Sequence, residues 1–165
     1  MSDQQHRLGV VAGFSAYGLW GVFPLVFRLL DDVSAVEILF HRIAWSLVVV
    51  VVVLAAQRRF AELAVLARHR RSLQRLALAA VFISVNWLTY IWAVNSGHVV
   101  DAALGYYVNP LFTVALGVAV LHERLRPAQR VALGFGVASV LVLTVANGRV
   151  PWVALVLAAS FGMYG

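Results

Sequence analysis

Five stretches of about 20 residues run through this chain with few or no charged side chains, and they limit what it can fold into. They cover residues 8–27, 36–56, 76–94, 102–121 and 128–146. A helix of roughly 20 apolar residues crosses a hydrocarbon layer of about 30 Å. Each stretch has to be helical, because a lone strand would leave its backbone N–H and C=O groups unsatisfied in lipid. We therefore predict an all-α integral membrane protein with five complete transmembrane helices.

Composition agrees with this class and narrows the chemistry. Charged residues make up 12% of the chain and hydrophobic residues 62%, whereas a soluble domain carries about 25% charged residues. The chain has no cysteine, so disulfides and thiolate chemistry are excluded. It has no phosphate-binding GxxxxGK[ST] loop, no HExxH and no GxSxG motif, and its histidines are scattered. We expect no cofactor, no metal site and no enzymatic activity.

The arginines predict how the helices are oriented. With the amino terminus inside, the inner segments hold ten of the thirteen basic residues, namely Arg7, Arg58, Arg59, Arg68, Arg70, Arg71, Arg75, Arg124, Arg126 and Arg130. The positive-inside rule therefore predicts a multi-pass protein of the inner (plasma) membrane with a cytoplasmic amino terminus. The same distribution explains the net charge of +6 without nucleic acid as a partner. The loop 57–75 spaces its apolar side chains on one helical face, which favours a short helix on the inner leaflet.

A short motif occurs twice. Residues 17–21 read YGLWG and residues 161–165 read FGMYG, so an aromatic, a glycine, a long aliphatic, an aromatic and a glycine recur in order. Five crossings separate the copies, and an odd number places them in opposite orientations. Such a pattern is typical of the inverted-topology repeats of transporters.

Motifs along nearly the whole chain carry a resemblance to a known family. They are Tyr17, Trp20-Gly21 and Pro24; Glu37-Ile-Leu-Phe-His-Arg42 with Trp45-Ser46; Asn86-Trp87 and Ile91-Trp-Ala-Val-Asn95; Leu104-Gly-Tyr-Tyr-Val-Asn-Pro-Leu111; and Leu121-His-Glu-Arg-Leu125. The set resembles the EamA family of the drug/metabolite transporter superfamily, and within it the RarD-type permeases. The resemblance implies ten helices in two five-helix inverted repeats, with a substrate path between them.

On this basis residues 1–148 are expected to be a first five-helix repeat and residues 149–165 the start of a second one. We expect the five helices to pack together and the sixth segment to dock loosely. The implied function is secondary transport of small organic molecules, drugs or metabolites by alternating access, coupled to ions or protons in the full-length form. The alternatives are a non-transporting partner subunit or an inactive fragment, and less favourably an intramembrane enzyme. Expected partners are the lipid bilayer, a small-molecule substrate, a second repeat and, as an option, further copies of the chain.

Three ionisable residues stand at the start of the second span. Glu37 and His41 share one helical face at spacing i, i+4, while Arg42 points about 140° away from Glu37. Ionisable groups inside a span are costly and suggest function, here proton exchange or substrate binding. The alternative is that they lie in the outer interface and orient the helix.

Polar residues in the third and fourth spans complete the candidate substrate and coupling set. Asn86 is placed in a polar cavity or in an interhelical hydrogen bond, because an unsatisfied amide is costly in lipid. Tyr106, Asn109 and Thr113 share a face of the fourth span. Pro110 frees the carbonyl of Tyr106 and predicts a kink, which is either functional or merely structural.

Overall fold

The computed structural model describes residues 3–165, and all the regular structure in that range is helical. The helices are α1 (Asp3–Arg28), α2 (Ala35–Ala56), α3 (Phe60–Arg68), α4 (Arg70–Asn95), α5 (Val99–Leu121), α6 (Pro127–Asn147) and α7 (Trp152–Tyr164). Helices α1, α2, α4, α5 and α6 are long and apolar enough to cross a membrane, and α7 is a shorter apolar helix. The all-α membrane fold is thus confirmed. Helix α3 also confirms the short helix expected between the second and third spans.

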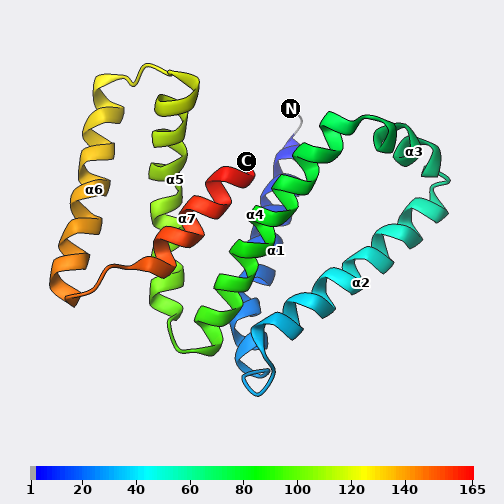
Figure 1. Ribbon diagram of the computed structural model, residues 1–165, viewed down its shortest axis with the longest axis horizontal. Helices are drawn as coiled ribbons and strands as arrows, with labels where there is room; N and C mark the ends of the chain where they lie inside the picture. The colour runs from blue at the N-terminus through cyan, green and yellow to red at the C-terminus, as the bar shows by residue number, and fades with distance from the viewer. Residues whose placement is uncertain (1–2) are drawn as a thin grey trace.

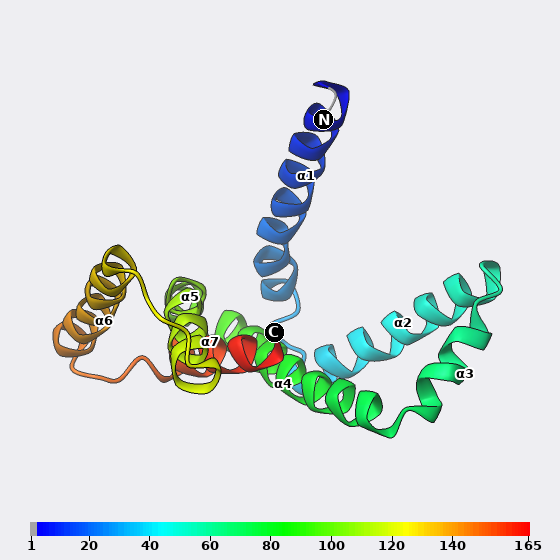
Figure 2. The ribbon, with the colours of Figure 1, turned by 90° about the horizontal axis from the view of Figure 1, so that it is seen from above.

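Helix α4 is the centre of the arrangement. In Figure 1 it lies between α2 on one side and the α5–α7 pair on the other, with α6 forming the outer edge beside α5. Figure 2 shows α1 rising away from the layer that the other long helices form. Helix α4 contacts α1, α2, α3, α5 and α7. The amino-terminal and carboxyl-terminal parts of the chain therefore meet on this one helix.

Helix α7 is the most deeply packed helix, which corrects the expectation of a loosely docked sixth segment. It lies against α5 and α4, and its residues Val153, Leu157 and Ala158 are each at most 2% exposed. The membrane-crossing part of α6, in contrast, contains no buried residue, and only 6% of the residues in the corresponding parts of α1 and α2 are buried. The prediction that the five long helices pack together as one bundle was also wrong, because α1, α2 and α6 bury few or none of their residues. Periodicity identified the helices but not the partners that each one has.

Two glycines explain why α7 packs so closely. A Cβ atom added at Gly105 of α5 would lie 2.8 Å from the Cβ of Leu157. One added at Gly162 of α7 would lie 2.7 Å from Cδ1 of Phe112. Both distances are shorter than a carbon–carbon contact of about 3.5–4.0 Å. Only a residue without a side chain lets these two backbones approach so closely, as is common between membrane helices.

Local sequence signals define where other elements begin and bend. Helix α2 starts after Ser34, whose hydroxyl accepts a hydrogen bond from the backbone N–H of Glu37 at 3.2 Å, and serine is a preferred residue at this position. Pro110 lies inside α5, which continues as a helix on both sides of it. Because proline lacks an N–H, the carbonyl of Tyr106 loses its usual helical partner there. The predicted kink remains a prediction.

Candidate functional site

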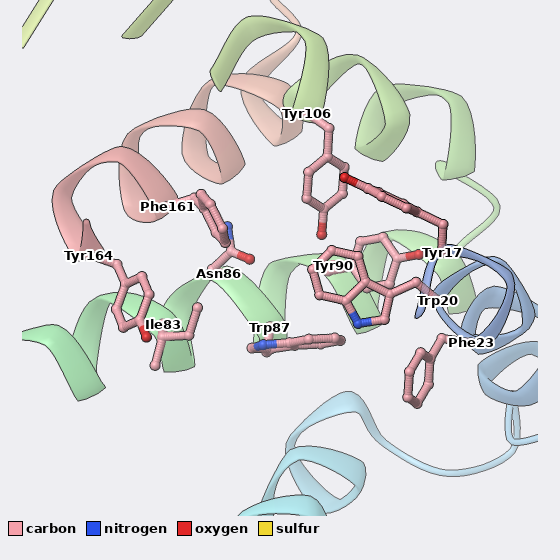
Figure 3. A pocket seen from close by; sticks show the side chains of 10 residues that line it. All are labelled: Tyr17, Trp20, Phe23, Ile83, Asn86, Trp87, Tyr90, Tyr106, Phe161 and Tyr164. Carbon is pink, nitrogen blue, oxygen red and sulfur yellow. The ribbon is translucent and has the colours of Figure 1, made fainter. Parts of the chain in front are cut away.

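A cavity of about 590 Å³ opens between α1, α4, α5 and α7. Its walls are mostly aromatic, and Figure 3 shows these side chains: Tyr17, Trp20, Phe23, Ile83, Asn86, Trp87, Tyr90, Tyr106, Phe161 and Tyr164. Eight of these ten residues carry aromatic rings, and none carries a formal charge at neutral pH. A concave, mostly apolar space with a few polar groups is the usual form of a small-molecule site. This cavity is therefore the candidate functional site.

Both copies of the repeated motif line the cavity. The first copy contributes Tyr17 and Trp20 from α1, and the second contributes Phe161 and Tyr164 from α7. In Figure 3 the two pairs face each other across the space. The aromatic positions of YGLWG and FGMYG thus occupy matching places on opposite walls. In transporters built from inverted repeats the substrate site also lies where the two repeats meet, and the repeat itself remains a prediction here.

Asn86 fixes the α7 wall against α4. Its side-chain amide donates to the carbonyl oxygen of Leu157 at 3.0 Å and to the hydroxyl of Ser160 at 3.1 Å. Asn86 is 2% exposed and Ser160 is 5% exposed. The interhelical hydrogen bond expected for Asn86 is therefore present, and the residue also lines the cavity. A second contact, between the rings of Trp92 and Trp152 at 5.1 Å, joins the same two helices near the start of α7.

Tyr90 connects the aromatic walls through edge-to-face contacts. Its ring centroid lies 5.8 Å from Trp87 and 6.0 Å from Tyr106, with the ring planes 86° and 75° apart. It also contacts Phe27, which is 5% exposed. Such pairs add roughly 0.5–1.5 kcal/mol each beyond the burial of their surface. Ring contacts therefore link α1, α4 and α5 around the cavity.

Arg42 stacks on the tryptophan that forms the base of the cavity. The central carbon of its guanidinium lies 3.2 Å from the centroid of the Trp87 ring and 5.6 Å from that of Phe23. Its Nη1 atom is buried and has no hydrogen-bond partner among the described residues. Arginine stacks well on aromatic faces because its charge is delocalised over a plane. This contact places a positive charge directly behind the cavity wall.

The remaining predicted site residues lie in three different environments. Glu37 and His41 are exposed on α2 and outside the cavity, so their role in coupling remains a prediction. Tyr106 lines the cavity. Thr113 lies at the α5–α7 contact, where its hydroxyl is 3.5 Å from a Cβ built on Gly162. The side-chain oxygen of Asn109 is buried without a hydrogen-bond partner within residues 3–165.

The four aromatic residues of the repeated motif were missed as site residues. Their similarity was used only as a sign of repetition, although both copies place aromatic rings at i and i+3. Residues three apart lie on the same helical face. Two aromatic pairs on equivalent faces were the available signal. The Arg42–Trp87 stack had no signal in sequence, because the two residues come from different helices.

Comparison with known proteins agrees with the architecture. Residues 7–145 match the EamA-like transporter family. Protein RarD of Streptomyces exfoliatus is 53% identical over 164 residues, which cover 99% of this chain and 52% of that protein. The uncharacterized transporter PA0485 of Pseudomonas aeruginosa is 42% identical over 165 residues, covering 100% of this chain and 55% of the relative. Protein RarD of Escherichia coli is 41% identical over 165 residues, with 100% and 56% coverage.

The chain thus spans about half the length of the curated relatives it matches. No solved structure matches it.

Proposed function

The chain belongs to the EamA-like transporter family and is of the RarD type, and from this premise we propose that it transports small organic molecules across the cytoplasmic membrane by alternating access. The observation that carries the proposal is the aromatic cavity. Two copies of one motif, on helices of opposite predicted orientation, line it from opposite walls. Rocking two such halves against each other about a fixed site is the usual mechanism of inverted-repeat transporters.

The cavity walls favour a substrate with a planar apolar body. Rings such as Trp20, Trp87 and Tyr164 offer flat surfaces for stacking, while Asn86 and the tyrosine hydroxyls supply a few polar contacts. At about 590 Å³ the space is within the usual range of roughly 300–1,000 Å³ for small-molecule sites. Drugs and aromatic metabolites are the classes of molecule that fit this description.

A second five-helix repeat is part of the proposal. Gly18 occupies in YGLWG the position that Gly162 occupies in FGMYG, yet a Cβ added at Gly18 would meet nothing within 4 Å. If α1 and α7 are equivalent, a helix of the second repeat covers Gly18 as α5 covers Gly162. The relatives, about twice as long as this chain, have room for such a repeat.

Coupling is assigned to the exposed face of α2. Glu37 and His41 are one turn apart there, and we propose that they exchange protons with the outer solution during transport. Glu37→Gln is expected to reduce transport driven by a pH gradient more than it reduces expression. Equal transport across the pH range would leave Glu37 with an anchoring role only.

The second candidate function is that of a non-transporting membrane partner, and the largely uncovered sides of α1, α2 and α6 favour it, because they leave room to pack against another protein. Reconstitution separates the two candidates. The chain is placed in liposomes alone and together with the second half of the Streptomyces exfoliatus relative, and uptake of labelled planar aromatic compounds is measured under a pH gradient. We expect uptake with both halves and none with this chain alone. Trp20→Ala should lower the uptake measured with both halves, whereas Phe14→Ala should not, because Phe14 is exposed and lies outside the cavity. No uptake in either preparation would contradict transport and support the partner role.

A further inference from the structure

A second hollow lies on the far side of Trp87. It has a volume of about 240 Å³, it is formed by α2 and α4, and its polar residues are Arg42, Ser46 and Ser84. Trp87 and Ile83 line both this hollow and the aromatic cavity. Figure 3 shows the Trp87 ring edge-on, between the cavity side chains and helix α2. The two spaces are therefore neighbours that share one aromatic wall.

Arg42 has unused binding capacity in this hollow. The ion pairs formed within residues 3–165 are Arg59–Glu62 and Arg149–Asp101, so no carboxylate neutralises Arg42. A guanidinium carries five N–H donors in its plane, and stacking on the Trp87 ring uses none of them. The buried Nη1 atom has no acceptor in the described part of the chain.

A charge in this place is costly unless something compensates it. Arg42 is the eighth residue of α2, about 10 Å along the helix from its outer end. Stacking on an aromatic ring compensates only part of the cost of placing an arginine within a membrane helix. A planar cation beside two hydroxyl groups matches an oxyanion, which it binds through two parallel hydrogen bonds. The hollow thus has the groups that a carboxylate requires.

We propose that Arg42, Ser46 and Ser84 form an anion subsite, and that the substrate is an organic acid whose planar aromatic body lies in the neighbouring cavity. This assignment deepens the proposed function and rests on it, because the bound acid is a substrate only if the protein transports it. A ring stacked on the cavity face of Trp87 lies about 3.5–4 Å from the indole, and the guanidinium is 3.2 Å from the other face. The two positions are thus about 7 Å apart across the indole, so the proposed substrate carries its carboxylate on a flexible chain that passes the edge of Trp87.

The positive charge also selects against one class of ligand. The positive guanidinium is attracted to the electron-rich face of the Trp87 ring, and its charge weakens the attraction of that ring for a second cation. The cavity has no carboxylate of its own. Aromatic amines and quaternary ammonium compounds are therefore disfavoured relative to aromatic acids of the same shape.

The test is equilibrium dialysis of the purified chain, in a non-ionic detergent, with 4-(2-naphthyl)butanoate (the naphthyl acid) and with the neutral 4-(2-naphthyl)butanamide of nearly the same shape (the naphthyl amide). A charge-assisted hydrogen bond predicts that the naphthyl acid binds about tenfold more tightly. Arg42→Gln should bring both compounds to the affinity of the amide, and Arg42→Lys should keep part of the difference. Arg28→Gln is the matched control, because Arg28 is exposed at the end of α1. Ser84→Ala, which removes one hydroxyl, should weaken binding of the naphthyl acid about threefold and provides a second variant if Arg42→Gln does not fold.

The same measurement distinguishes an organic acid from a lipid phosphate, the other source of an oxyanion. It is repeated in nanodiscs of neutral phosphatidylcholine and of anionic phosphatidylglycerol. A preference for the naphthyl acid that depends on Arg42 in both membranes supports the proposal. Equal affinity for the two compounds, or a preference unchanged by Arg42→Gln, overturns it, and so does a preference abolished by anionic lipid. Binding needs no transport, so binding of the naphthyl acid through Arg42, together with no uptake when both halves are reconstituted, would refute the transport function and leave the subsite standing.

Discussion

Replacing Asn86 with leucine tests how α7 is held in place. The leucine has nearly the same volume but donates no hydrogen bond, so the change removes the contacts to the Leu157 carbonyl at 3.0 Å and the Ser160 hydroxyl at 3.1 Å. Neither partner is left unsatisfied. The Ser160 hydroxyl still donates its proton to the Val156 carbonyl at 2.6 Å, and the Leu157 carbonyl lies inside α7, where the backbone N–H four residues later is its helical donor.

The expected loss follows from these two bonds. A hydrogen bond between membrane helices contributes about 0.6 kcal/mol on average and about 1.7 kcal/mol at most. Losing both predicts that the free energy of unfolding falls by about 1–2 kcal/mol in Asn86→Leu. Asn86→Asp should lose more, about 2–4 kcal/mol, because a buried carboxylate would face the Leu157 carbonyl oxygen and have only the Ser160 hydroxyl as a donor.

The assay is unfolding of the purified protein by sodium dodecyl sulfate, followed by tryptophan emission. This signal reports on the interface because Trp92 contacts Trp152 between the same two helices. Gln74→Leu, at an exposed position of α4, is the control and should not change the midpoint. If Asn86→Leu matches the wild type and Asn86→Asp is no worse than Asn86→Leu, then Asn86 does not hold α7.

Two further predictions concern packing and topology. Gly162→Leu should destabilise the protein by at least about 1–3 kcal/mol, because the leucine side chain would overlap Phe112. Gly18→Leu, at the matching position of the other motif copy, should have almost no effect. Equal losses at both glycines would contradict the packing of α7. A single cysteine at Ser72 should resist an impermeant thiol reagent added to intact cells, whereas a single cysteine at Ser96 should react. The chain has no cysteine of its own, so only the introduced residue can be labelled. The opposite pattern would reverse the orientation predicted from the arginines.

Helix number, helix type and family could be read from sequence because they depend on local properties. Hydrophobic length, the requirement for internal backbone hydrogen bonds and the motifs Asn86-Trp87 and Tyr106-Tyr107 are all visible in one dimension. Even the short helix α3 follows from the spacing of its apolar residues. These features need no knowledge of which helices touch.

The packing and the site could be predicted only in part, because they depend on contacts between distant residues. The closeness of α7 comes from Gly105 meeting Leu157, a pair more than 50 positions apart, as their numbers show. Arg42 was a candidate because a charge within a span is unusual, but its stacking on Trp87 required the structure. The roles of Glu37, His41, Asn109 and Thr113 in transport remain predictions.

The central claim is that the two motif copies build one binding site, and affinity for the neutral probe 2-naphthamide tests it most directly. Trp20 and Tyr164 are equivalent positions in YGLWG and FGMYG, and they lie on opposite walls of the cavity. Equilibrium dialysis should show that Trp20→Ala and Tyr164→Ala each weaken binding about threefold to tenfold, because each removes one stacking surface. Phe14→Ala, in α1 but outside the cavity and 79% exposed, should bind the probe like the wild type. Loss of affinity from only one motif copy, or from neither, would contradict a shared site.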